Sequence, residues 1–330
     1  MQELVVAFAE NKAASAWTEA FQSGNSASND LELMKISPRT PLVGDWLKAG
    51  DLGFIFASRG IGKSWLSMYL AKGLANKTDV GPWKTHCQAR VLYLDGEMPP
   101  QDLKERNHLL GPSTPHLVYS NHELLFQNTG KVMNLADLDF QAGALQYCLL
   151  ENFNVLIADN LSTLAMGIDE NKSLDWELIS PWLLTLRRNH ITVIIVHHAG
   201  RNNQMRGSSK REDPAFWILR LDEDSSAADD QSGARFISRF TKWRNASAFP
   251  KTYKWHFRPL PDEDDIDITF EEASPLFVFV QWVNNGLETC SDIAIEMDIS
   301  KGYVSKLAKK ALSLGRIRFN GRHYAPIDEL

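Results

Sequence analysis

A glycine-rich segment, ASRGIGKS at residues 57–64, lies between the apolar run LGFIFA and a long helical pattern. Glycines in such a segment let backbone N–H groups turn toward phosphates, and a helix that begins at Lys63 directs its positive end at them. Lys63 then reaches the outer phosphates and Ser64 ligates magnesium. Ala57 replaces the usual first glycine, so we expect a weaker match rather than an inactive site. The segment predicts a phosphate-binding loop for ATP and Mg²⁺.

Two strand ends supply the acidic partners that such a loop needs. Asp159 ends the apolar run NVLIAD, where a carboxylate can hold magnesium through water, and Asn160 follows it instead of a glutamate. Glu97 in RVLYLDGEM is the candidate base, provided that its strand lies beside the strand of the phosphate loop. Alternatively, Asp95 and Glu97 form only a turn that caps the next helix. The residues expected to contact the nucleotide are Ser58, Arg59, Gly60, Ile61, Gly62, Lys63, Ser64, Trp65 and Asp159.

The composition is that of an ordinary globular chain. Its 330 residues, 44% of them hydrophobic, suffice for one large domain and a small one. A net charge of -6 argues against a surface adapted throughout to nucleic acid. Three scattered cysteines without CxxC spacing suggest neither a zinc site nor disulfides. The N-terminal residues do not resemble a signal peptide, and no run is long enough to span a membrane, so we expect a cytoplasmic protein.

Three segments differ in pattern. Residues 1–46 predict an N-terminal helix followed by the polar linker SGNSASND, an arm rather than a domain. Residues 47–272 predict an α/β domain with a mainly parallel sheet and crossover helices. The runs LGFIFA, RVLYLD, NVLIAD and ITVIIVHH are apolar, as in central parallel strands, whereas FWILRL, ARFISRFTKW and KTYKWHF alternate, as in antiparallel hairpins. The acidic segments DEDSSAADDQSG and PDEDDID are interpreted as solvated connections.

Residues 41–257 contain five motifs in the order found in the RecA-like ATPases, and this segment resembles that family. Within it, the resemblance is to the RepA-like branch, the hexameric replicative helicases of plasmids and other mobile elements. The five motifs are PLVGDWLKAGDLGFIFASRGIGKS, VLYLDGEM, VLIADN, VIIVHHAG and RGSS. The resemblance implies that Glu97 is the catalytic glutamate and that Asp159 is the second acid on the magnesium side. It also implies that His197 and His198 sense the γ-phosphate, although paired histidines at a strand end are otherwise usually structural.

Two basic elements fit a motor. In RecA-like rings, the position of the loop RNNQMRGSSKRED lines the central channel and touches single-stranded DNA; the alternative is a solvated loop with incidental charge. Lys242-Trp243-Arg244 resembles the lysine-x-arginine element that such rings insert into the neighbouring subunit's nucleotide site; the alternative is an exposed strand end with two surface cations. The loop cations are Arg201, Arg206, Lys210 and Arg211.

Residues 273–330 predict a winged helix-turn-helix: a helix, a short helix with Ser291 or Asp292 as N-cap, a longer helix, and a hairpin around Asn320-Gly321. In the longer helix, the apolar face is expected to hold Val304, Leu307, Ala308, Ala311 and Leu312. The local excess of basic residues is the electrostatic footprint of a DNA contact, although winged helices also dock proteins. The expected DNA contacts are Lys306, Lys309, Lys310, Arg316, Arg318 and Arg322.

We therefore expect a RecA-like ATPase with a winged helix. It would assemble as a homo-oligomeric ring, a hexamer, and couple hydrolysis to movement on DNA or to its remodelling. A replicative helicase or helicase-like loader of a plasmid, phage or integrated element is the leading hypothesis. A DNA-binding regulator in which ATP only switches the oligomeric state is the alternative. A signalling ATPase without a nucleic acid partner is a third class.

Overall fold

The computed structural model describes residues 12–167, 176–199, 212–224, 233–245, 250–260, 264–297 and 299–327. Contacts divide the chain into two units, residues 1–39 and 40–330. In the first unit, α2 (Lys12–Gly24) is the expected N-terminal helix. A second helix, α3 (Ser28–Leu33), begins inside the segment that we expected to be a polar linker. Asp30 in its first turn favours helix there, because a negative charge interacts well with the positive end of a helix.

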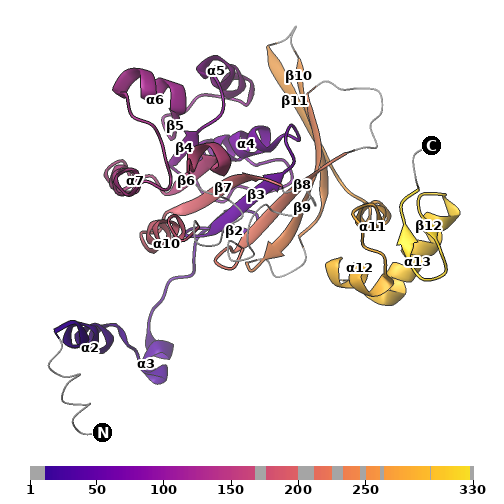
Figure 1. Cartoon of the computed structure of the whole chain (residues 1–330), viewed down its shortest axis with the longest axis horizontal. Helices are drawn as coiled ribbons and strands as arrows, with labels where there is room; N and C mark the ends of the chain where they lie inside the picture. Colours follow the sequence, from indigo (N-terminus) through magenta and orange to yellow (C-terminus); the bar gives the residue numbers. More distant parts are fainter. Residues whose placement is uncertain are drawn as a thin grey trace. The chain divides into compact units, whose positions relative to one another are not determined.

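Nine strands of the described residues form one sheet in the second unit, in the order β11-β10-β9-β8-β3-β7-β6-β4-β5 (Figure 1). β8, β3, β7, β6, β4 and β5 run parallel to one another. β8 with β9, β9 with β10, and β10 with β11 form antiparallel pairs. The bounds are β3 Leu52–Ala57, β4 Val91–Asp95, β5 Leu117–Asn121, β6 Val155–Asp159, β7 Thr192–His198, β8 Trp217–Glu223, β9 Ala234–Trp243, β10 Tyr253–Leu260 and β11 Asp265–Glu272.

Three sheet details differ from the sequence expectations. β8, expected in an antiparallel hairpin, pairs antiparallel with β9 but also in parallel with β3, and it is buried over most of its length. β5 was not expected, because its short LVYSN run is buried only at its two ends. β11 begins at Asp265 inside the acidic segment that we interpreted as a loop, since its acids lie on an exposed edge strand where charge is tolerated.

Helices cover both faces of the sheet, and alternate residues of β3 contact the two layers. Ile55 belongs to the cluster with α4 (Lys63–Asn76) and α5 (Pro100–Leu109). Phe54 belongs to the cluster with α7 (Leu138–Leu150), α8 (Leu161–Leu164) and α10 (Ser180–Arg188), against which α6 (His122–Thr129) also packs. These two layers hold the carboxyl ends of the parallel strands in place.

The core begins before residue 47, where we expected the ATPase domain to start. A small hairpin of β1 (Pro41–Val43) and β2 (Leu47–Lys48) precedes β3. Trp46 at its turn is 2% exposed and lies edge-on to Trp217, with ring centroids 4.7 Å apart. Leu42, Val43 and Trp46 are therefore part of the core, and residues 40–46 belong to the second unit rather than to an arm.

A separate hydrophobic cluster holds the C-terminal elements together. These are α11 (Pro275–Asn284), α12 (Cys290–Glu296), α13 (Lys301–Ser313), and the hairpin of β12 (Arg318–Phe319) with β13 (Tyr324–Ala325). Thr289, not Ser291 or Asp292, caps α12, and its hydroxyl accepts a hydrogen bond from the Asp292 N–H. Leu312 is 36% exposed and so lies outside the expected apolar face.

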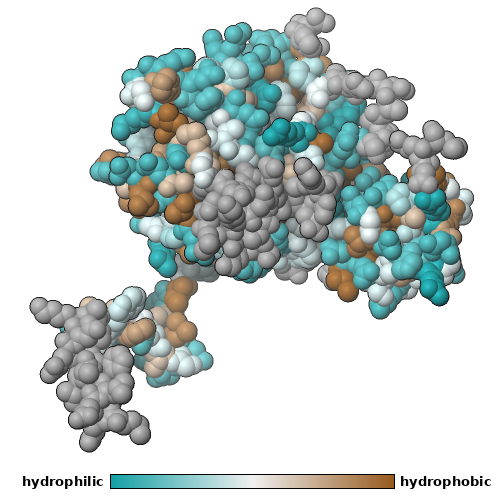
Figure 2. Space-filling view, in the orientation of Figure 1, coloured by the Kyte–Doolittle hydropathy of each residue, from teal (hydrophilic) through white to brown (hydrophobic). Residues whose placement is uncertain are grey.

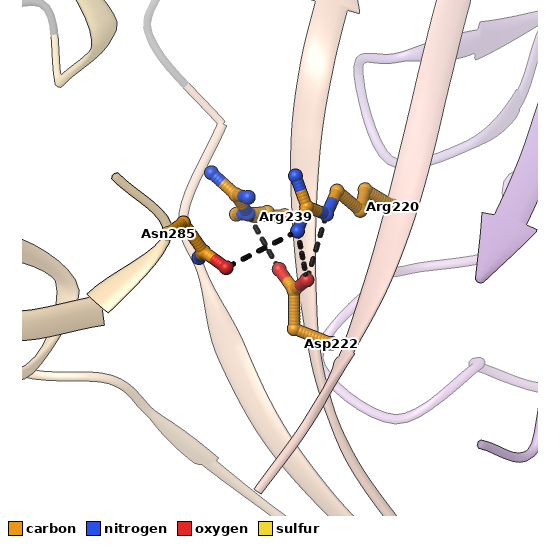
Figure 3. Close-up of polar contacts among 4 residues, drawn as sticks. All are labelled: Arg220, Asp222, Arg239 and Asn285. Carbon is orange, nitrogen blue, oxygen red and sulfur yellow. Dashed lines mark hydrogen bonds and ion pairs between the residues drawn. The ribbon is translucent and has the colours of Figure 1, made fainter. Parts of the chain in front are cut away.

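A buried group of charges connects β8 and β9 with α11 (Figure 3). Asp222 accepts hydrogen bonds from Arg220 and from Arg239, each at 2.7 Å, and Arg220 also donates to Asn285. The Arg239 guanidinium lies 3.8 Å from the centroid of the Trp282 ring. Asp222 opens the acidic segment that we expected to be solvated, yet it is only 8% exposed. We call Arg220, Asp222 and Arg239 the Asp222 cluster.

Candidate nucleotide-binding site

The glycine-rich segment forms the turn between β3 and α4. Gly62 has a φ of +113°, and a Cβ there would lie 2.9 Å from the Phe236 ring, so both conformation and space require glycine. α4 begins at Lys63, directly after this turn, with the positive end of its dipole toward the loop. The local structure is therefore that of the predicted phosphate-binding loop.

A cavity of about 390 Å³ opens beside this loop, within the range of small-molecule sites. The turn after β4, α5, the end of β7 and the start of β9 contribute its other walls. Its lining residues are Arg59, Gly60, Gly62, Lys63, Ser64, Trp65, Glu97, Met98, Pro99, Arg106, His198, Gly233 and Ala234. Of the residues expected to contact the nucleotide, Ser58, Ile61 and Asp159 are not among them.

Lys63 is 6% exposed and folds back on its own loop. Its Nζ donates to the carbonyl oxygens of Ala57 and Ser58, at 3.2 and 2.8 Å. Burial lowers the pKa of Lys63, whereas the charges of Asp159 and Glu97 raise it. An ammonium held by two carbonyl oxygens can exchange them for phosphate oxygens without a further loss of hydration.

Glu97 lines the cavity, although β7 and β6 separate its strand from β3. The condition that we set for Glu97, a strand directly beside the phosphate-loop strand, is therefore not met. The turn after β4 reaches across because it packs closely on β6: the Gly96 N–H donates to the Asp159 carbonyl at 2.7 Å, and a Cβ on Gly96 would lie 2.6 Å from Thr163 Oγ1. Asp95 does cap this turn, accepting from the Glu97 N–H at 3.2 Å, but the turn also brings Glu97 to the cavity.

Asn160 contacts the Glu97 side chain directly. The Asn160 amide nitrogen donates to the Glu97 carboxylate. Its amide oxygen accepts from the Thr163 N–H at 3.2 Å, as the N-cap of α8. This second bond fixes the orientation of the amide, so that its N–H₂ group points at the carboxylate.

Asp159 lies behind the loop, 2% exposed, with its two carboxylate oxygens in different surroundings. Oδ2 accepts from the Tyr93 hydroxyl at 2.7 Å, whereas Oδ1 has no partner among the described residues. Burial raises the pKa of Asp159, and hydrogen bonds from the Tyr93 and Ser64 hydroxyls lower it. A buried carboxylate beside the Ser64 hydroxyl fits the oxygen-ligand chemistry of Mg²⁺. With bound MgATP, Ser64 and Asp159 would hold the metal, which neutralises phosphate charge.

The two histidines at the end of β7 have different environments, because successive side chains of a strand point to opposite faces. His197 is fully buried, and only His198 lines the cavity. Burial lowers the pKa of His198 to about 4, and the Lys63 charge contributes. His198 is therefore neutral at pH 7 and can offer a hydrogen bond rather than a positive charge.

Lys242 and Arg244 do not reach this cavity. Trp243 pairs with Trp217, which pairs with Gly53, near the start of β3. The phosphate loop follows the opposite end of β3, about 13 Å away at about 3.3 Å per residue. Arg244 donates to the Asp213 carbonyl at 3.1 Å, and Lys242 donates to the Glu212 carbonyl. Arg201, Arg206, Lys210 and Arg211 lie outside the described residues.

Sequence reasoning missed two residues near the loop. The Arg106 guanidinium lies 4.8 Å from the centroid of the Trp65 ring and lines the cavity. Tyr93 contacts Asp159 from the middle of a strand, where the apolar run gives no sign of a polar role. For Arg106, the sequence offered only one indication: its helical spacing from Pro100, which places it in the last turn of α5.

Residues 18–204 match a family model described as AAA domain, which is more than half of the chain. The chain belongs to this family of P-loop ATPases. The matched range of the AAA domain contains the phosphate loop, Glu97, Asp159 and both histidines, but not β8 to β11 or the C-terminal helices. A search of curated proteins found no match for the chain. None of the described helices has the length and apolar character needed to cross a membrane.

Proposed function

We propose that this AAA domain is a DNA-dependent ATPase of the RecA/RepA type, working in a homo-oligomeric ring as a replicative helicase or helicase-like DNA remodeller of a plasmid, phage or mobile element. The observation that carries the proposal is the cavity that brings the phosphate loop, Glu97 and His198 together. Lys242 and Arg244 lie away from the cavity of their own chain, so a role in hydrolysis would place them at the site of a neighbouring subunit.

In the proposed reaction, the loop N–H groups and Lys63 hold the outer phosphates of ATP. Glu97, held by Asn160, orients the attacking water and accepts its proton. His198 stays neutral and hydrogen-bonds near the γ-phosphate. Arg244 of a neighbouring copy stabilises the charge that develops on the transferred phosphoryl group, as an arginine finger does.

Exposed apolar side chains support an assembly. On the second unit, brown residues gather over α6 and α7 in Figure 2, and there Phe126, Leu138 and Leu150 are 55%, 74% and 70% exposed. The first unit exposes 66% of Trp17 and 80% of Leu33. Large exposed apolar areas are uncommon on monomers and mark interaction sites.

Steady-state ATP hydrolysis without DNA, with single strands and with duplex tests the function directly. We expect single-stranded DNA to stimulate turnover, because translocation couples each hydrolysis event to a strand in the channel. Lys63→Ala serves as the control for contaminating activity and should abolish the stimulation. Equal turnover in all three conditions would contradict a DNA-dependent ATPase.

The regulator hypothesis remains the second candidate, because the C-terminal elements from α11 to β13 have their own core and an exposed basic face. It requires tight, sequence-specific duplex binding with negligible turnover. Replacing the exposed Lys306, Lys309 and Lys310 by glutamate should weaken duplex binding in either case. Only under the motor hypothesis does that variant keep ATP hydrolysis stimulated by single strands. Failure of both DNA forms to bind at moderate salt would indicate the signalling class instead.

Mixed rings test the action of Arg244 between subunits. Lys63→Ala subunits lose their own site but still present Arg244, whereas Arg244→Ala subunits keep their site but present no arginine. Random mixing at one to one should restore about a quarter of the sites, since a head-to-tail interface sets each site against one neighbour. Mixing Lys63→Ala with Glu97→Gln subunits is the matched control and should restore nothing. Full activity of Arg244→Ala alone would place Arg244 outside the reaction, and an inactive Arg244→Ala without recovery in the first mixture would exclude its action between subunits.

A further inference from the structure

Tyr93 lies in the middle of β4 with its hydroxyl fully buried. That hydroxyl is 2.7 Å from Asp159 Oδ2 and 2.8 Å from Ser67 Oγ. Ser67 is itself fully buried and lies 3.4 Å from the same Oδ2. An ionised carboxylate only accepts hydrogen bonds, so the Tyr93 proton points at Asp159.

This arrangement distinguishes the two oxygens of Asp159. Oδ2 accepts the Tyr93 proton at 2.7 Å, and the single Ser67 proton is directed at the Tyr93 oxygen, 2.8 Å away, rather than at Oδ2, 3.4 Å away. A carboxylate held at one oxygen cannot rotate freely about its χ2 torsion. Oδ1 is buried and has no hydrogen-bond partner in the part of the chain that the structure describes. The Tyr93 hydroxyl therefore holds the carboxylate in the orientation in which Oδ1 is available to a ligand.

We infer that Tyr93 is a positioning residue for magnesium: its hydroxyl holds Asp159 so that Oδ1 is presented to the metal of MgATP, directly or through water. The inference rests on the proposed use of Asp159 in metal binding. Hydrogen-bond partners of metal-binding groups orient those groups, and losing one weakens metal affinity by about 10- to 100-fold. Tyr93 lies in β4 and Glu97 in the turn that follows it, so β4 and its turn would support both the metal and the water.

The test is Tyr93→Phe in the full chain, which removes one oxygen and keeps the ring. ADP binding is measured by calorimetry over a range of Mg²⁺ concentrations and in EDTA. We expect the Mg²⁺ concentration for half-maximal enhancement of ADP binding to rise by about 10- to 100-fold, with ADP affinity in EDTA unchanged. In hydrolysis, the requirement for Mg²⁺ should rise while the KM for ATP at saturating Mg²⁺ stays the same.

Tyr119→Phe is the matched control. Tyr119 is the neighbouring tyrosine, with ring centroids 5.4 Å apart, and its buried hydroxyl has no hydrogen-bond partner among the described residues. It should leave the Mg²⁺ dependence as in the wild type. A general loosening of β4 and β5 would instead change both variants alike, and that result would overturn the positioning role.

Asp159→Asn separates this inference from the function on which it rests. If Asp159→Asn removes the Mg²⁺ enhancement and Tyr93→Phe does not change it, the role of Tyr93 is wrong and the metal site stands. If Asp159→Asn has no effect, the metal site itself is wrong. Ser67→Ala removes the hydroxyl that contacts the Tyr93 oxygen and should raise the Mg²⁺ requirement by a few-fold, which gives the same test if Tyr93→Phe does not fold. Wild-type Mg²⁺ dependence in the folded variant would overturn the inference.

Discussion

Glu97→Gln is expected to bind ATP with the wild-type affinity and to hydrolyse it about 10²- to 10⁴-fold more slowly, the usual contribution of a general base. The amide has the same shape as the carboxylate but cannot accept the proton of the attacking water. Its oxygen can still accept the hydrogen bond from Asn160, so the turn after β4 should keep its conformation. The substitution therefore separates the chemistry from the architecture of the site.

Two measurements are needed for Glu97→Gln: nucleotide affinity by calorimetry and single-turnover hydrolysis of bound ATP. Glu105→Gln is a suitable control, because Glu105 is an exposed glutamate of α5, eight residues further on, and does not line the cavity. It should behave as the wild type in both measurements. Hydrolysis that survives intact in Glu97→Gln would mean that another group activates the water.

Local pattern predicted four of the parallel strands and the glycine-rich turn, because apolar runs and glycine spacing are properties of contiguous residues. The segments LGFIFA, RVLYLD, NVLIAD and ITVIIVHH became β3, β4, β6 and β7, and α4 begins at Lys63 as expected. The AAA domain match rests on the same stretch of chain. Patterns within contiguous residues were thus sufficient to indicate the ATPase family and the position of the phosphate loop.

The order of the strands was not predictable in this way. Which strands become neighbours depends on the packing of the crossover helices. The sequence RVLYLDGEM therefore does not indicate that β4 lies next to β6 rather than next to β3. Glu97 lines the cavity although its strand is not beside β3, because the turn after β4, not the strand itself, brings it there.

Side chains that act on other side chains were also beyond sequence reasoning. Asp222 stood in an acidic segment, where solvation is the ordinary expectation, and only the pairing of β8 with β9 placed two arginines around it. Tyr93 looked like one more large residue of a buried strand. Both cases need the register between strands, which sequence spacing along one strand does not contain.

Asp222→Asn is expected to lower the free energy of unfolding by about 3–5 kcal/mol, the cost of leaving buried charge without its partner. The Arg220 and Arg239 side chains are 9% and 7% exposed, and Asp222 is the carboxylate that both contact. Asparagine keeps the volume but removes the negative charge, so two guanidinium groups remain side by side in a poorly hydrated space. Burial already lowers the pKa of Arg239, which shows how unfavourable its charge is there.

Urea unfolding followed by tryptophan fluorescence measures the effect, and Asp267→Asn is the control. Asp267 pairs with Arg258 at 2.8 Å across β10 and β11, but those side chains are 38% and 43% exposed. Removing that pair should cost less than about 1 kcal/mol, since exposed ion pairs contribute little. Equal losses in the two variants would contradict the role of burial in the Asp222 cluster.

The Asp222 cluster also links the stability of the sheet to the C-terminal helices, because Arg239 stacks on Trp282 and Arg220 donates to Asn285 at 3.4 Å (Figure 3). Asp222→Asn frees both guanidinium groups from the orientation that these contacts require. We therefore expect limited proteolysis to cut Asp222→Asn between β11 and α11 faster than the wild type, while Asp267→Asn is cut at the wild-type rate. Faster unfolding of the sheet without faster cleavage at that junction would show that the cluster stabilises β8 and β9 alone. Cleavage at the junction is thus the readout that distinguishes a charge cluster joining two parts of the chain from one that serves only the sheet.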